Sequence, residues 1–502
     1  MHLLTILAFA CILWRAETPP EFWLIARGNA LGTAAAAVGL VAVIGLAAGW
    51  LTWHARRKLS SAPGSFGPHA FHHRGMMVLR VLLIVGFAAL VMATAWPDWF
   101  AFATWSPWLQ ILGDLITLIP FVLGSVLLWI IAFPFERELR AKGDGHAPGD
   151  DWSLWTYLDF HLRHQLLVVA VPMLLILLAA DLTRGFDKQL TAWSGSVFAP
   201  EVALGAAAAL VFVLSPMLLC RVWRTETLAS GPVRDRLEAL CRRINLRFRD
   251  ILFWKSGGVM INAAVMGVFA PVRYVLLSDA LLSGMTPEQV EAVFGHEAGH
   301  IRHRHIPHFL VFAFVGWVIV VGVMEGLACA SLGSDPWLRL SLPTIEGLGL
   351  IATGVFWGLG FGWVSRSFER QADLFGARCV AASAASCDAP CSVHLDSGQA
   401  TDEPQRVCSA GAAVFASALE RVAELNGIPR DERSWRHGSI GQRVRFLAKV
   451  AGDPGCAVRF ERRMVRVKRL IWAAAAAGGV AVVLYWLAVP QPAILLLQSG
   501  GH

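Results

Sequence analysis

The sequence predicts a mainly α-helical, polytopic membrane protein with about eight transmembrane helices and an α+β domain that contains a small antiparallel sheet. Three observations lead to this fold class. The 502-residue chain is 56% hydrophobic and 16% charged, with a mean hydropathy of +0.55, which is too apolar for a soluble protein of this length. Its apolar residues gather into runs of about 20 residues, the length that crosses a hydrocarbon core. A less apolar region carries mixed helix and strand patterns and a paired-histidine motif.

The apolar runs define the predicted transmembrane helices, because few charges interrupt them. They lie near residues 30–53, 76–97, 108–134, 165–181, 199–220, 307–332, 343–364 and 470–498. Residues 1–14 are also apolar, but this run has no basic n-region and no clear cleavage site, so an uncleaved, partly buried segment is expected. Asp114, Glu325 and Glu346 fall within apolar runs. Either polar contacts between helices or a watery substrate chamber would satisfy them.

The chain divides into five predicted parts. A membrane domain with about five helices occupies 1–220, and a transmembrane hairpin at 307–364 separates two pieces of the α+β domain, 221–306 and 365–467; a last transmembrane helix lies in 468–502. Apolar, β-branched and aromatic residues between glycine-rich breaks favour strands. Extended stretches are predicted at 250–254, 260–266 and 272–277, and helices near 233–244, 286–304, 366–382, 412–425 and 440–450.

The most informative motif is His296-Glu297-Ala298-Gly299-His300. Thr286 and the proline after it form a helix-start signal, so the motif is predicted to lie inside a helix. Histidines at positions i and i+4 project from one face and can hold one Zn²⁺, while the intervening glutamate can reach a metal-bound water as general base.

A catalytic zinc site needs a third protein ligand. The best candidate is Glu369, four residues before Asp373, which would orient a ligating histidine. The alternative is that Glu369 and Asp373 are ordinary surface charges at the start of a helix. Two apolar spans separate His300 from Glu369, and an even number of crossings returns the chain to the side it left. The third ligand can therefore meet the first two.

These motifs, with Ser278-Asp279-Ala280-Leu281-Leu282, resemble those of a known family over roughly residues 220 to 450. It is the family of integral-membrane zinc metallopeptidases that includes the bacterial HtpX proteases and the eukaryotic CAAX prenyl endopeptidases. The resemblance implies a zincin-like (gluzincin) fold and one Zn²⁺ per chain. It implies His296, His300 and Glu369 as the zinc ligands and Glu297 as the catalytic base.

Two further sites follow from the same resemblance. Asn262-Ala263 is similar to a pair that lies on a strand along the substrate cleft of that family. His437 is similar to a histidine that lies close to the substrate oxyanion, although the two prolines that often follow it are absent here. The resemblance thus implies substrate binding for the pair and a catalytic role for His437.

Lysine and arginine are concentrated in the loops at 54–75 and 135–164 and after residue 220, which places these segments and both motifs on the cytoplasmic side. The expected location is a bacterial inner (plasma) membrane. Five cations precede the last span and can also contact anionic headgroups. They are Arg462, Arg463, Arg466, Lys468 and Arg469.

The predicted function is that of a membrane-bound zinc metalloendopeptidase that hydrolyses peptide bonds at the cytoplasmic face, in membrane protein quality control or peptide processing. One alternative is a CAAX-type processing protease of prenylated proteins. Another is a non-catalytic, zinc-stabilised membrane receptor or transporter, against which the intact Glu297 argues. The expected partners are a peptide or membrane-protein substrate and the lipid bilayer, with no nucleic acid. Neither the natural substrate nor the oligomeric state can be read from the sequence.

For the other cysteines and histidines, an interpretation without a metal is favoured. Cys379, Cys387, Cys391 and Cys408 lie around an alanine- and serine-rich insert with His394, and reduced thiols are favoured over a second metal site because the spacing matches no common zinc module. The histidines that follow the metal motif are expected at the membrane interface rather than as ligands. They are His303, His305 and His308.

Overall fold

The structure, a computed structural model, forms two compact units, Met1–Arg224 and Thr225–His502. It describes residues 2–17, 30–61, 67–101, 110–143, 153–196, 199–258, 260–332, 339–383 and 407–488. The two units are described separately below.

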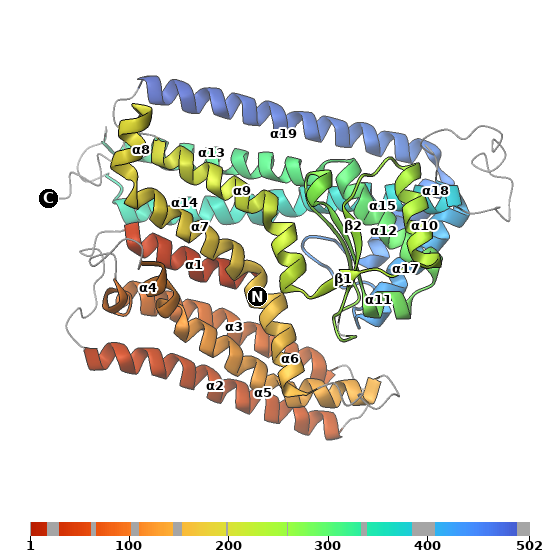
Figure 1. Ribbon diagram of the computed structural model, residues 1–502, viewed down its shortest axis with the longest axis horizontal. Coiled ribbons are helices and arrows are strands. Elements are labelled where there is room, and N and C mark those ends of the chain that lie inside the picture. Colours follow the sequence, from red (N-terminus) through yellow and green to blue (C-terminus); the bar gives the residue numbers. More distant parts are fainter. Residues whose placement is uncertain are drawn as a thin grey trace. The chain divides into compact units, whose positions relative to one another are not determined.

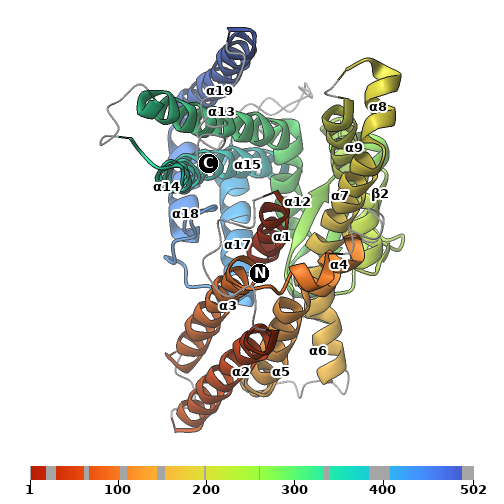
Figure 2. The same ribbon diagram turned by 90° about the vertical axis from the view of Figure 1, so that its left-hand side faces the viewer.

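The described residues of the first unit form helices and turns, and the long helices α2, α3 and α5 lie side by side (Figure 2). The large side chains Phe87, Phe121, Trp129 and Tyr157 are fully buried among them. The N-terminal apolar run forms α1, which adds Phe9 to this core. The elements are α1 (His2–Glu17), α2 (Ala30–Ser61), α3 (Gly67–Ala93), η2 (Asp98–Phe100), α4 (Gln110–Thr117), α5 (Ile119–Gly143), α6 (Leu154–His161), η5 (Leu162–Leu167), α7 (Val168–Gly185), α8 (Asp187–Ser194) and α9 (Ala199–Val222).

The second unit combines the three helices α13, α14 and α19 with a small α+β region. Helix α13 packs against both α14 and α19, and the three run along one another in Figure 1. The elements are β1 (Thr225–Thr227), α10 (Pro232–Arg243), β2 (Asp250–Trp254), β3 (Ala263–Met266), η6 (Ala270–Val272), β4 (Tyr274–Ser278), α11 (Asp279–Gly284), α12 (Pro287–Arg302), α13 (His305–Leu332), α14 (Leu342–Val355), η8 (Phe356–Phe361), α15 (Gly362–Ser383), α17 (Ser409–Leu425), α18 (Ile440–Gly452) and α19 (Pro454–Ala488).

Eight helical segments among the described residues are long and apolar enough to cross a membrane, which confirms the predicted number. Two of the three acidic residues in the apolar runs, Asp114 and Glu325, are each only 8% exposed. Gln110 donates a hydrogen bond to Asp114 at 2.8 Å, and Tyr485 of α19 donates one to Glu325 of α13. A hydrogen bond within its own unit therefore satisfies each of these two carboxylates, whereas Glu346 is partly exposed.

The sheet is mixed, so the prediction of an antiparallel sheet is wrong for one of its strand pairs. The strand order is β1-β2-β4-β3; β2 and β4 are parallel, and the other two pairs are antiparallel. After β2 the chain forms β3 at one edge of the sheet. It then reverses direction, and β4 lies between β2 and β3, parallel to β2. The central strand β4 is buried from Val275 to Ser278, as expected for a strand with neighbours on both sides. Strand β1 was not predicted.

Small residues bring α12 and α15 unusually close. A Cβ on Gly299 would lie 3.0 Å from Cα of Ala372, and one on Gly295 would lie 3.1 Å from Cα of Gly376. Protein interiors have little free volume to accommodate such additions. Glycines on α12 therefore allow the close crossing that places the polar residues of α15 next to the histidines of α12.

Candidate metal centre

Helix α12 begins as the sequence predicts. Thr286 is the N-cap, and its side chain and that of Gln289 form a reciprocal capping box. The cap fixes where the helix starts, so that His296 and His300 project from the same face one turn apart. His296 is 9% exposed and His300 is partly buried.

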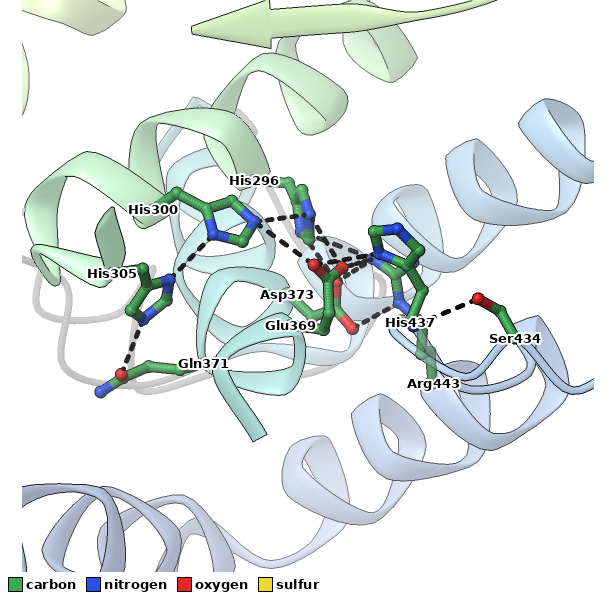
Figure 3. A network of polar contacts seen from close by, with 9 residues as sticks. All are labelled: His296, His300, His305, Glu369, Gln371, Asp373, Ser434, His437 and Arg443. Atoms are coloured by element: carbon green, nitrogen blue, oxygen red, sulfur yellow. Dashed lines mark hydrogen bonds and ion pairs between the residues drawn. The ribbon is translucent and has the colours of Figure 1, made fainter. Parts of the chain in front are cut away.

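Helix α15 brings Glu369 to this pair of histidines (Figure 3). The two Nε2 atoms of His296 and His300 are 3.3 Å apart, and the Glu369 oxygens lie 3.4 Å from the first and 3.7 Å from the second. Ligands about 2.0–2.2 Å from a tetrahedral Zn²⁺ are separated from one another by roughly 3.4 Å. The three side chains thus have the donor types and the spacing that zinc requires, with a fourth position left for a non-protein ligand.

Asp373, held by Arg443, supports His296 at Nδ1, whereas Glu369 faces Nε2. The His296 Nδ1 lies 2.9 Å from Oδ1 of Asp373, which is 0% exposed. Arg443 donates to both Asp373 oxygens, from Nε at 2.8 Å and from Nη2 at 2.5 Å. A bidentate arginine keeps the carboxylate ionised and oriented, so Asp373 fixes the imidazole with Nε2 toward the other two donors.

The electrostatics of the site favour a cation beside Glu369. Burial, followed by the nearby His296, lowers the pKa of His300 to about 4, so this imidazole is neutral near pH 7. Burial also opposes a charge on His296, but hydrogen bonds to Asp373 and Glu369 outweigh it and raise the pKa of His296 to about 10. The proton on Nε2 of His296 faces Glu369, where a divalent metal would take its place, while Nδ1–H remains hydrogen-bonded to Asp373.

Glu297 lies on α12 and faces the edge strand β3. Burial raises the pKa of its carboxyl group above the usual value for glutamate, and the backbone N–H of Val265 hydrogen-bonds to it. Asn262 and Ala263 lie at the start of β3: Asn262 is exposed, while Ala263 is 4% exposed and paired with Leu277 of β4. The structure thus brings the predicted substrate-lining pair onto the strand beside Glu297.

His437 reaches the site from the loop before α18. Its Nδ1 lies 3.0 Å from Oε1 of Glu369, and its side chain is 49% exposed. Two contacts hold the loop: the Trp435 indole donates to the Gly358 carbonyl at 2.7 Å, and Arg366 donates to the Trp435 carbonyl at 2.8 Å. Gly358 belongs to the π-helical segment η8, in which the usual helical hydrogen bonding is altered.

Sequence reasoning missed three buried residues around this centre: Arg443, His305 and Gln371. Arg443 lies on the same face of α18 as Ile440 and Leu447. A cation within the apolar face of an amphipathic helix is the sequence signal from which its burial could have been predicted. His305, which was expected at the membrane interface rather than as a ligand, is 0% exposed and hydrogen-bonded to His300.

The cysteine insert falls mostly outside the described residues. Cys379 is buried on α15, and Cys408 is buried at the N-cap of α17. Cys387, Cys391 and His394 lie outside the described part of the chain.

This fold and site define an integral-membrane protein with a metallopeptidase-type centre. Residues 227–448 match Peptidase family M48. The match supports the prediction of a membrane metallopeptidase and favours neither alternative.

Several curated relatives share part of the sequence. The chain is 30% identical over 115 residues to a protein described as "Protease HtpX homolog" from Archaeoglobus fulgidus, an alignment that covers 22% of this chain and 31% of that protein. A protein with the same description from Aeropyrum pernix is 24% identical over 271 residues, which is 49% of this chain and 83% of the relative. Among solved structures, Ste24p from S. mikatae superposes with a TM-score of 0.49 at 15% identity, over 84% of this chain and 99% of that chain.

Proposed function

We propose that this protein is a membrane-bound zinc metalloendopeptidase that hydrolyses peptide bonds of peptide or membrane-protein substrates at the cytoplasmic face. The observation that carries the proposal is the cluster of His296, His300 and Glu369 donors, 3.3–3.7 Å apart, with Glu297 on the same helix. Two histidines and one carboxylate are a zinc ligand set typical of hydrolases.

Each proposed role has a structural basis. Zinc held by the three donors would activate a water molecule and polarise the scissile carbonyl. Glu297 takes the proton of the attacking water and delivers it to the leaving amine, and its raised pKa suits a group that must hold a proton between these steps. His437 helps to stabilise the oxyanion.

The β3 edge offers a mode of substrate binding. It is the last strand of the sheet on the side of α12, so an extended peptide can pair with its main chain next to Glu297. Recognition through main-chain hydrogen bonds tolerates many sequences, which suits a protease with several substrates.

The test is cleavage of an unfolded protein or a fluorogenic peptide by the detergent-purified full chain, with and without a zinc chelator. Glu297→Gln keeps both histidines and a similar volume, so it should retain zinc and lose at least about 100- to 10,000-fold in cleavage rate. Near wild-type cleavage by this variant, or no effect of the chelator on the wild type, would overturn the proposal.

A further inference from the structure

A chain of four hydrogen-bonded polar side chains, of which His305 and Gln371 are buried, runs from His300 away from the centre to α19. His300 Nδ1 lies 2.9 Å from Nδ1 of His305, and His305 Nε2 lies 3.1 Å from Oε1 of Gln371 (Figure 3). The same Gln371 oxygen accepts a hydrogen bond from Nζ of Lys468 on α19 at 2.8 Å. Four helices, α12, α13, α15 and α19, therefore contribute one side chain each.

The direction of each hydrogen bond follows from the lysine. A lysine ammonium can only donate, so Gln371 presents its oxygen, and His305 must carry its proton on Nε2 in order to donate to that oxygen. Neutral His305 then offers an unprotonated Nδ1, which can only accept from the Nδ1–H of His300. The lone pair of His300 is thereby left on Nε2, the nitrogen that faces His296 and Glu369.

We infer that His305, Gln371 and Lys468 form a positioning relay that fixes the tautomer and the ring orientation of His300 for metal binding. The inference rests on the proposed function, because it takes His300 as a metal ligand. The relay is the counterpart of Asp373, which does the same for His296 with a carboxylate. The relay makes the zinc affinity of the site depend on Lys468 of α19.

The surroundings of His305 allow packing to be separated from hydrogen bonding. Its ring is 0% exposed and stacks on Phe368, with the centroids 4.2 Å apart and the planes 7° from parallel. His305→Phe preserves this stack but leaves the Nδ1–H of His300 without an acceptor. In His305→Asn the amide oxygen can take the place of Nδ1, so this variant restores the acceptor and loses the stack.

The experiment measures zinc affinity of the purified full chain by competition with a chromophoric chelator, and the visible spectrum of the Co²⁺-substituted protein. His305→Phe should bind zinc about 10- to 100-fold more weakly than the wild type. His305→Asn should recover part of that loss, and the Co²⁺ spectrum of His305→Phe should differ from that of the wild type. His308→Phe, on the same helix and outside the relay, should bind as the wild type does.

Three results are decisive. If the wild type binds zinc and His305→Phe binds it with the same affinity, the relay is overturned and the proposed function stands. If the wild type binds no zinc, both are overturned. An affinity loss in His305→Asn at least as large as that in His305→Phe would show that packing, not the acceptor, matters. Should His305→Phe fail to fold, Lys468→Met replaces it, with Arg469→Met as control: weaker zinc binding of the former alone supports the relay, and equal affinities overturn it.

Discussion

Asp373 lies 2.9 Å from Nδ1 of His296, although the two residues come from α15 and α12, which are separated in the sequence by α13 and α14. The carboxylate is itself held by Arg443 of α18. This contact connects three segments of the second unit at one imidazole. Helix α15 therefore supplies both the proposed ligand Glu369 and the carboxylate Asp373 that orients His296.

Asp373→Asn should weaken zinc binding by about 10- to 100-fold, because the neutral amide orients His296 less strongly and leaves the buried Arg443 without its ionised partner. Chelator competition measures the change. Arg443→Met should have an effect in the same direction. Arg445→Met is the matched control on α18, since Arg445 is 66% exposed; unchanged zinc affinity in Asp373→Asn would contradict this account.

Gly299→Ala should destabilise the protein by about 1–3 kcal/mol, because the added methyl group forces α12 and α15 apart. Thermal unfolding in detergent measures the loss. Gly452→Ala is the control, since a Cβ there meets nothing within 4 Å. The close packing of the two helices would be refuted by equal unfolding temperatures in the two variants.

His437→Phe should lower kcat/KM by about 100-fold or more while the zinc content stays the same, because an oxyanion donor acts mainly in the transition state. Peptide cleavage and metal analysis measure the two quantities. Arg436→Ala changes an exposed neighbour in the same loop and should have little effect. Loss of zinc in His437→Phe would instead assign His437 to the support of Glu369, its partner at 3.0 Å.

Sidedness can be tested within the second unit. In a background in which the nine native cysteines are replaced, Ser341→Cys should react with an impermeant thiol reagent in intact cells, and Ser283→Cys should react only after permeabilisation. Both positions are exposed, at the start of α14 and on α11. The reverse pattern would place the metal centre outside the cytoplasm.

Local signals in the sequence were sufficient for most helices. The capping residues Thr286 and Ser439 mark the starts of α12 and α18 within a residue of the predicted positions, since a cap acts on its own first turn. The number of spans follows from hydropathy alone. Strand β1 was missed because Thr225–Thr227 is three residues long and polar, and alternation of side chains does not reveal whether β2 and β4 are parallel.

The metal ligands could be proposed from spacing and from the even number of spans between them, but their supporting residues could not. His305 meets Gln371 across 66 residues, and Arg443 meets Asp373 across 70. No short motif encodes such contacts. They depend on how closely α12, α15 and α18 pack, which only the folded structure reveals.

The central claim is that His296, His300 and Glu369 hold one zinc ion. Its most direct test is the zinc content per chain of the purified wild type and of Glu369→Ala, measured by elemental analysis after exhaustive dialysis. The account predicts about one equivalent in the wild type and a large loss in the variant, because two histidines alone form an incomplete site. Equal zinc in both proteins, or none in the wild type, would contradict it.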